Sequence, residues 1–252
     1  MDMNYFEAMA AAFRPDSTPL LIIGTITFAI GFLQYIYSVR LLVREKLSPF
    51  PVWMHTFYVA HDSTWAFLFY FASANYHDNP VFMAVSIAHV VWVLLEIFSL
   101  VQIVRFDISR REQFGLYFGA NVSHHQAVLM IVGQLAAFYA LMNLGVHFMG
   151  EGSYMHTAIL TQFIMAIGPG VLWMRRGSRA GGGMGVALCI IASTVVSFQP
   201  WSMWVIAMPY VFDTPWFYLM GVACLAITLF YAVTVARFPA KTPTADGKKP
   251  IW

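Results

Sequence analysis

Two stretches of this chain, VAHDSTWAFLFYF at residues 59–71 and SIAHVVWVLLEIFSL at residues 86–100, decide the fold. Both are apolar, and each carries one histidine and one carboxylic acid in the middle of a longer apolar run. These four residues are His61, Asp62, His89 and Glu96. A charged carboxyl at the centre of a bilayer costs about 2.5–3.5 kcal/mol even on the most permissive insertion scales. Two such acids at similar depth therefore indicate an internal polar site.

The composition is that of a membrane protein. The chain has 252 residues, of which 60% are hydrophobic and only 10% charged, whereas soluble domains contain about 25% charged residues. The formal net charge of +2 makes nucleic acid an unsuitable partner. Cys189 and Cys224 both lie in apolar segments, which indicates neither a disulfide framework nor a thiolate metal site. The partners to expect are the lipid bilayer and an apolar small molecule, and assembly into an oligomer or a larger membrane complex stays open.

Apolar runs of about 20 residues can cross a bilayer as single helices. They predict an all-α, polytopic membrane protein, a seven-transmembrane-helix bundle, with spans near 19–42, 50–73, 81–105, 125–148, 156–174, 184–208 and 215–237. Gln199-Pro200 and Pro209 interrupt the sixth span, so we expect it to kink or to end early. The connection 106–124 is polar with aromatic residues, which predicts a partly amphipathic interfacial segment.

Basic residues alternate between the connections and predict the orientation. They gather in four segments, namely 40–46, 105–111, 175–179 and 237–249. By the positive-inside rule these segments are cytoplasmic, and the N-terminus is outside. The domain organisation is then an extracytoplasmic segment 1–18, a transmembrane domain 19–237 and a cytoplasmic polar tail 238–252, for which the composition predicts disorder. The short loops favour the bacterial inner membrane as its location.

Helical periodicity arranges the polar residues of the second and third spans. His89, Trp92 and Glu96 follow one stripe at i, i+3 and i+7, and Asp62 shares a face with Trp65. The two spans are joined by a short loop, so we expect them to be antiparallel neighbours whose midpoints meet at the same depth. Both carboxyl groups are therefore expected to face one closed chamber.

Further polar residues are expected to line this chamber as substrate-binding groups, alongside the two tryptophans. They are Gln134, Gln162, Thr228 and Tyr231. An alternative for Gln134 and Thr228 is a structural role, since buried Gln and Thr often join helices by hydrogen bonds. His55 lies near the cytoplasmic boundary of its span, and we expect it at the membrane interface.

A carboxyl group in a dry pocket favours its neutral form and can act as a general acid near neutral pH. Asp62 is the candidate acid and Glu96 its partner, while His61 and His89 would orient them or relay protons. The indole rings of Trp65 and Trp92 would attract a cation within about 6 Å. These groups suit protonation of an alkene or epoxide and shielding of a carbocation.

Five segments also follow the pattern of a known group of membrane enzymes. Residues 65–67 (WAF) stand where that group resembles Trp-Glu-Phe, and residues 92–96 (WVLLE) are similar to Trp-x-x-x-Asp. Residues 162–166 (QFIMA) resemble Asn/Gln-x-x-Met-Ser, and residues 175–178 (RRGS) resemble the Arg- and Gly-rich loop after it. Residues 224–231 (CLAITLFY) are similar to a segment that ends in Asp-x-x-Tyr.

Across residues 20–237 the chain thus resembles the integral-membrane terpene cyclases of fungal meroterpenoid and bacterial indole-terpenoid pathways. It resembles more distantly the emopamil-binding sterol isomerase group. The resemblance implies a seven-helix fold and protonation of a prenyl epoxide or olefin, a lyase or isomerase reaction. The two proton-handling acids of the family would fall on Ala66 and Thr228, which cannot donate such a proton. Asp62, one turn before Ala66, and Glu96 are the acids that would replace them.

Three functions stay open. The first is an acid–base enzyme of the terpene cyclase or isomerase type, acting without a cofactor on an apolar, isoprenoid-like substrate. The second is a small proton-coupled transporter, for which the interrupted sixth span is the supporting feature. The third is a metal- or haem-binding protein or an accessory subunit of a larger complex. A mixed nitrogen and oxygen metal site would use His61, Asp62, His89 and Glu96.

Overall fold

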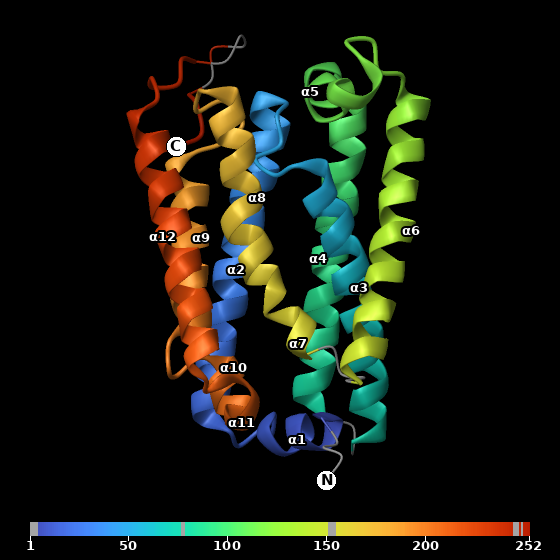
Figure 1. Ribbon diagram of the computed structural model, residues 1–252, viewed down its shortest axis with the longest axis vertical. Helices are drawn as coiled ribbons and strands as arrows, with labels where there is room; N and C mark the ends of the chain where they lie inside the picture. Colours follow the sequence, from blue (N-terminus) through green and yellow to red (C-terminus); the bar gives the residue numbers. More distant parts are fainter. Residues whose placement is uncertain (1–4, 77–78, 151–154, 244–246, 248) are drawn as a thin grey trace.

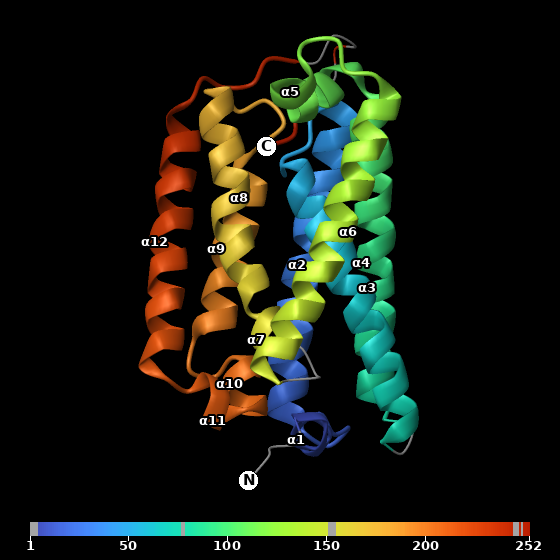
Figure 2. The same ribbon diagram turned by 45° about the vertical axis from the view of Figure 1, so that its right-hand side comes forward.

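The computed structural model describes residues 5–76, 79–150, 155–243, 247 and 249–252, and every regular element in this part of the chain is a helix. The helices are α1 (Tyr5–Ala12), α2 (Thr18–Glu45), α3 (Val52–Asn75), α4 (Pro80–Arg105), α5 (Asp107–Phe118), α6 (His124–Met149), α7 (Met155–Ala158), α8 (Leu160–Arg176), α9 (Met184–Phe198), α10 (Met203–Ala207), α11 (Pro209–Phe212) and α12 (Pro215–Arg237). The long helices run side by side between two ends of an elongated bundle (Figures 1 and 2). α5 lies at one end, and α1, α10 and α11 lie at the other.

Among the described residues, six segments are long and apolar enough to cross a membrane. They are Thr18–Glu45, Pro80–Arg105, His124–Phe148, Met155–Arg176, Met184–Ala207 and Pro215–Arg237. They coincide with six of the expected spans and indicate an integral membrane protein. The expected second span, 50–73, corresponds to α3, which is as long as the others but carries too many polar residues to belong to this set.

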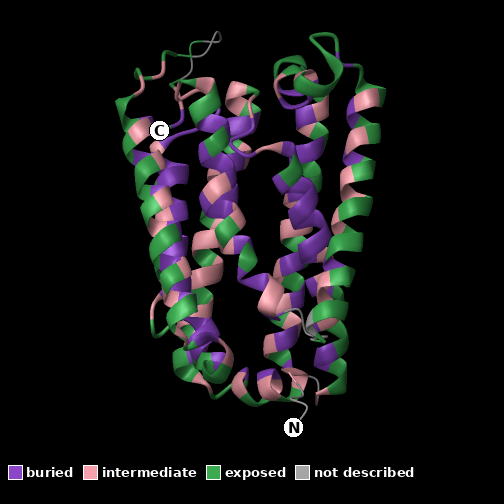
Figure 3. Ribbon diagram, viewed as in Figure 1, coloured by how far each residue is buried: buried purple, intermediate pink, exposed green. Residues whose placement is uncertain are grey.

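α3 is a long helix that falls short of the apolarity of the six candidate spans, and it is also one of the most enclosed. Buried residues follow it almost continuously from Val52 to Trp65, whereas α6 carries mostly exposed and partly exposed residues (Figure 3). α3 packs mainly on α4 and α6. The arrangement has a physical cause, because polar side chains facing hydrocarbon would be left without partners, so the helix that carries them must face protein.

The interruption expected in the sixth span and the amphipathic segment expected in the connection 106–124 are both present. One further interruption was not indicated by the sequence. α9 ends at Phe198 and α10 begins at Met203, so the interruption at Gln199-Pro200 is confirmed. Residues 107–118 of the polar connection form α5, a short helix that buries Phe114 and exposes Ile108. The unexpected irregularity is at Ile159, where a turn separates α7 from α8.

Side-chain caps fix where several helices begin. Asn79 accepts hydrogen bonds from the backbone N–H groups of Val81 and Phe82, at 2.9 and 3.4 Å, at the start of α4. Ser123 and Gln126 form a reciprocal capping box on α6. Thr214 caps α12, whose first residue is a proline. Each cap satisfies backbone donors that have no partner inside the helix, and this determines the depth at which each helix starts.

Candidate functional site

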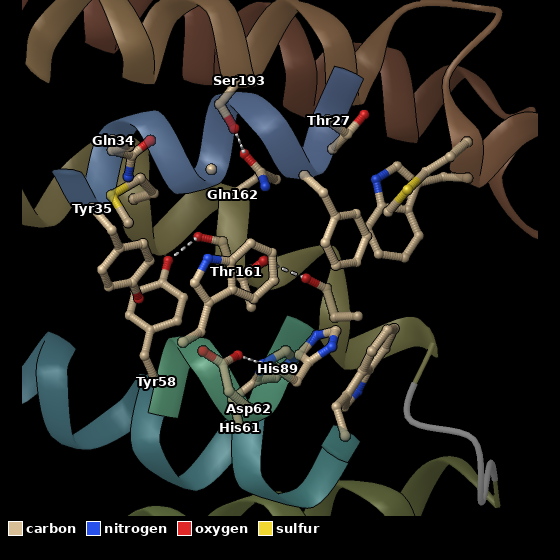
Figure 4. Close-up of a pocket in the computed structure, with 18 residues that line it drawn as sticks. Thr27, Gln34, Tyr35, Tyr58, His61, Asp62, His89, Thr161, Gln162 and Ser193 are labelled. Carbon is tan, nitrogen blue, oxygen red and sulfur yellow. Dashed lines mark hydrogen bonds and ion pairs between the residues drawn. The ribbon is translucent and has the colours of Figure 1, made fainter. Parts of the chain in front are cut away.

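A cavity of about 100 Å³ lies inside the bundle at the level of Asp62 (Figure 4). Its wall is built from α2, α3, α4, the α7–α8 segment, α9 and α10. The lining side chains include the polar groups Thr27, Gln34, Tyr35, Tyr58, His61, Asp62, His89, Thr161, Gln162 and Ser193, and the indoles of Trp65, Trp92 and Trp204. The α3 contribution follows helical spacing, since Tyr58, Asp62 and Trp65 recur at i, i+4 and i+7.

Asp62 is the carboxylic acid on the cavity wall. Its Oδ1 lies 2.8 Å from Nδ1 of the adjacent His61, and the two side chains are only 4% and 5% exposed. The other carboxyl oxygen, Oδ2, and the other imidazole nitrogen, Nε2, are buried and have no partner among the described residues. An acidic oxygen and a basic nitrogen are thus left without partners, and a hydrogen bond from a ligand that reached them would remove the cost of leaving both groups unpaired.

Aromatic rings enclose the remaining space. The ring centroid of Trp65 lies 5.5 Å from that of His61, 5.2 Å from that of His89 and 6.4 Å from that of Trp204. Trp92 meets His89 edge-on at 5.1 Å. The indole N–H groups of all three tryptophans are buried and unpartnered within the described chain. The wall therefore combines π-faces, which attract positive charge, with unused hydrogen-bond donors.

His89 is held in one orientation by its own helix. Its Nδ1 donates a hydrogen bond to the carbonyl oxygen of Val85 at 2.8 Å. In the neutral imidazole this leaves Nε2 as an acceptor, so His89 can receive a proton rather than donate one. His61 and His89 both line the cavity, and the catalytic roles expected of them stay predictions.

Glu96 does not line the cavity, and the expectation that both acids face one chamber is wrong. Its carboxylate is fully buried in a separate niche, where the Tyr35 hydroxyl donates to Oε1 and the His55 imidazole contacts Oε2. His55 in turn lies 2.9 Å, through Nε2, from the Ser48 hydroxyl. Helical periodicity had placed Glu96 on the correct stripe, but the niche is filled by side chains from two other segments of the chain.

His55, which was expected at the membrane interface, is buried in protein beside Glu96. Its side chain is 1% exposed and lies between Glu96 and Ser48. A buried carboxylate requires hydrogen-bonding partners, and His55, on the neighbouring helix, supplies one. Tyr35 joins this niche to the cavity, because its ring lines the cavity while its hydroxyl binds Glu96.

The expected substrate-binding residues divide into two groups. Trp65, Trp92 and Gln162 line the cavity, and Gln162 accepts a 3.0 Å hydrogen bond from the Ser193 hydroxyl. The other three do not line this cavity and make contacts within or between helices. Gln134 accepts from Thr56 at 3.0 Å between α6 and α3, Thr228 donates to the Leu225 carbonyl of its own helix, and the Tyr231 ring packs on Gly170 of α8.

Several lining residues were not singled out from the sequence, among them Tyr58, Tyr35 and Trp204. Tyr58 lies one turn before Asp62, and its hydroxyl donates to the carbonyl of Thr161 at 2.8 Å. The i, i+4 spacing of Tyr58 and Asp62 could have indicated it. Tyr35 is contributed by α2 and Trp204 by α10, and nothing in their local sequence distinguishes them from the other interior aromatic residues.

The mixed metal site considered from the sequence is not assembled. Glu96 is bound to Tyr35 and His55, so it does not converge with His61, Asp62 and His89. Among the described residues no group of three or more His, Cys, Asp or Glu side chains is placed to hold a metal ion.

Comparison with known proteins adds no further identification: no family model, curated protein or solved structure matches this chain.

Proposed function

We propose that this protein is an intramembrane acid–base enzyme that acts on an apolar, isoprenoid-like small molecule bound in the cavity beside Asp62. The observation that carries the proposal is the unpaired Oδ2 of Asp62 beside a cavity walled by indole rings. The proposal requires the neutral carboxylic acid, because this is the form that donates a proton. The reaction belongs to the cyclase or isomerase type that the sequence resembles.

The proton balance needs only the groups on the cavity wall. The Asp62 carboxyl gives its proton to an alkene carbon or an epoxide oxygen of the substrate, and positive charge develops on a substrate carbon. The faces of Trp65 and Trp92 stabilise that charge. Loss of a proton from a neighbouring carbon ends the reaction, and this proton returns to the Asp62 carboxylate, directly or by way of Nε2 of His89, so that the acid is restored. Glu96 acts at a distance in this scheme, by holding the Tyr35 hydroxyl and so the position of the Tyr35 ring.

The size of the cavity sets a condition on the substrate. Its volume of about 100 Å³ is below the range of about 300–1,000 Å³ that is typical of ligand pockets. A longer isoprenoid therefore requires part of the wall to move. The two irregular segments border the cavity, because Ala158 and Thr161 flank the turn at Ile159, and Met203 and Trp204 open α10. We propose that the substrate enters where these two segments meet.

The test uses membranes that contain the protein, a panel of prenyl alkenes and prenyl epoxides, and D₂O as solvent. Protonation of an alkene carbon places one non-exchangeable deuterium in each product molecule, which mass spectrometry detects. Protonation of an epoxide oxygen places the deuterium on an exchangeable hydroxyl, so products of the epoxides are identified by their changed carbon skeleton. Asp62→Asn should lower product formation by about 10²–10⁴-fold, the usual contribution of a general acid. Asp213→Asn is the control, because that carboxyl lies outside the cavity and binds Tyr218 at 2.7 Å. Unchanged product formation by Asp62→Asn would remove Asp62 from the mechanism.

A second candidate function, a proton-coupled transporter, is favoured by the interruptions in two helices that both border the cavity. Interrupted helices are a common device for building substrate sites in transporters. Flux of the same panel into proteoliposomes under a pH gradient distinguishes the two functions. Accumulation without chemical change would support the transporter, and a deuterated product without accumulation would support the enzyme.

We also propose that α3 is a seventh membrane span and that the chain runs from an N-terminus outside to a C-terminus in the cytoplasm of a bacterium. α3 has the length of a span and lies alongside α4 and α6 (Figure 2). The basic ends of α2, α4, α8 and α12 gather at the end of the bundle that carries α5. By the positive-inside rule this end is cytoplasmic.

A further inference from the structure

A second and larger hollow, of about 970 Å³, lies at the C-terminal end of α2, away from the cavity beside Asp62. It is bordered by the last turns of α2, the loop after α8 and the described part of the tail. We call it the basic groove, because five of the described side chains that line it are cationic and one is acidic. The cationic residues are Arg40, Arg44, Lys46, Arg179 and Lys241, and the acidic residue is Glu45.

Glu45, the one acid among the described residues that line the basic groove, is already neutralised. Glu45 binds the Lys241 ammonium at 2.6 Å through Oε1 and accepts a hydrogen bond from the backbone N–H of Gly181 at 2.7 Å through Oε2. Arg179 already has hydrogen-bond acceptors, since it donates to the carbonyl oxygens of Val235 and Ala236 at the end of α12. These contacts shape the groove and leave the charges of the remaining cations uncompensated.

The remaining cations are available to an anion. Arg40 and Lys46 are exposed and make no hydrogen bond or ion pair with the described residues. Arg44 uses one terminal nitrogen on the Lys249 carbonyl at 2.9 Å, while its Nε is buried without a partner in the described chain. A buried guanidinium N–H that lacks an acceptor is unfavourable, and an anionic oxygen would satisfy it.

An apolar stripe leads along α2 into the basic groove. Ile22, Ile26, Leu33 and Ile36 are between 43% and 57% exposed and follow one face of the helix. Arg40 continues this face one turn later, and Val39 and Val43 line the groove itself. The stripe from Ile22 to Ile36 extends over about 21 Å of helix, comparable with a fatty acyl chain. An apolar surface of this length that ends at fixed positive charges suits the acyl chain and the phosphate of a phospholipid.

We propose that the basic groove binds the headgroup of an anionic phospholipid whose acyl chain lies along the exposed face of α2. The phosphate contacts Arg40, Arg44 and Lys46. A soluble phosphate compound would use the same charges but not the stripe, and the continuity of stripe and groove favours the lipid. This site does not depend on the reaction proposed for the cavity.

The test measures lipid retention by native mass spectrometry on the full-length protein in detergent, titrated with phosphatidylglycerol or phosphatidylcholine. We expect preferential binding of one phosphatidylglycerol. Each basic residue near an anionic surface is worth about a fivefold factor in affinity, so Arg40→Gln with Lys46→Gln should weaken phosphatidylglycerol binding about thirtyfold. Arg105→Gln with Arg237→Gln is the control, because both are exposed last-turn arginines outside the groove.

Three results would overturn the proposal. The first is equal retention of the two lipids, and the second is an equal loss of binding in the control pair. The third is displacement of phosphatidylglycerol by glycerol 3-phosphate at the same concentration, which would assign the groove to a soluble phosphate compound. Retention of phosphatidylglycerol by the wild type and the control pair, but not by the groove pair, would support the lipid site.

Discussion

His55 and Glu96 meet in the interior of the bundle, the imidazole Nδ1 against the carboxylate, with side chains that are 1% and 0% exposed. The residues are 41 positions apart and belong to α3 and α4, the two helices that pack most extensively on each other. Together with Tyr35 of α2, they connect three helices through one carboxylate. We infer that this niche fixes how the three helices are rotated about their axes, and therefore which residues of α3 face the cavity.

Loss of His55 should destabilise the protein strongly. His55→Ala leaves the Glu96 carboxylate buried with one partner fewer, and removing one member of a buried ionic pair costs about 3–5 kcal/mol. Glu96→Gln should be milder, because the amide keeps an oxygen for the Tyr35 hydroxyl and an N–H₂ donor for His55. Thermal unfolding in detergent measures both variants. Equal unfolding temperatures for wild type and His55→Ala would show that the niche does not hold the helices together.

The sequence predicted the acid of the cavity but not the surroundings of the second acid. An ionisable residue in an apolar span must face protein, so Asp62 could be placed inside the bundle from its position alone. Periodicity also placed His89, Trp92 and Glu96 on one stripe of α4. It could not decide which part of that stripe opens into free space. The packing of α2 against α4 decides this, because Tyr35 fills the space in front of Glu96.

The surroundings of the polar residues of α6 and α12 could not be predicted from the sequence pattern either. Gln134 and Thr228 are buried or half-buried polar side chains near mid-span, as expected, yet each is satisfied locally. A hydroxyl that bonds to a carbonyl of its own helix has no need of a ligand. Sequence pattern identifies such groups as interior, whereas their partners depend on the distances between helices.

Filling the cavity should abolish ligand binding without removing any polar group. Ala158→Leu adds a branched side chain to the buried cavity wall, so we expect purified protein to retain far less of any apolar compound carried over from the membrane. Chromatography with mass spectrometry of extracted small molecules measures the retention. Ala226→Leu on the exposed face of α12 is the control. Equal retention by the two variants would place the ligand elsewhere.

The contact between α8 and α12 should be intolerant of added bulk. A Cβ atom at Gly170 would lie 2.0 Å from the Tyr231 ring, so Gly170→Ala requires the helices to separate, at a cost of about 1–3 kcal/mol. Gly133→Ala, where a Cβ atom meets nothing within 4 Å, should instead stabilise α6 by about 1 kcal/mol. Tyr231→Leu in the Gly170→Ala background should recover stability if the ring is the obstacle. Thermal unfolding of the four proteins decides this, and no recovery would place the clash elsewhere.

Locating the two ends of the chain on one side or the other of the membrane tests whether α3 crosses it. Six crossings would place Asp16 and Thr242 on the same side, whereas seven place them on opposite sides. Cys189 and Cys224 are buried, so the background of labelling should be low. We expect an impermeant maleimide to label Asp16→Cys on intact cells, and Thr242→Cys and Tyr117→Cys only after the cells are permeabilised. Tyr117 is 61% exposed on α5 and marks the basic end of the bundle independently of the tail. Labelling of Asp16→Cys and Thr242→Cys from the same side would reduce the bundle to six crossings and leave Asp62 on a helix that does not span the membrane.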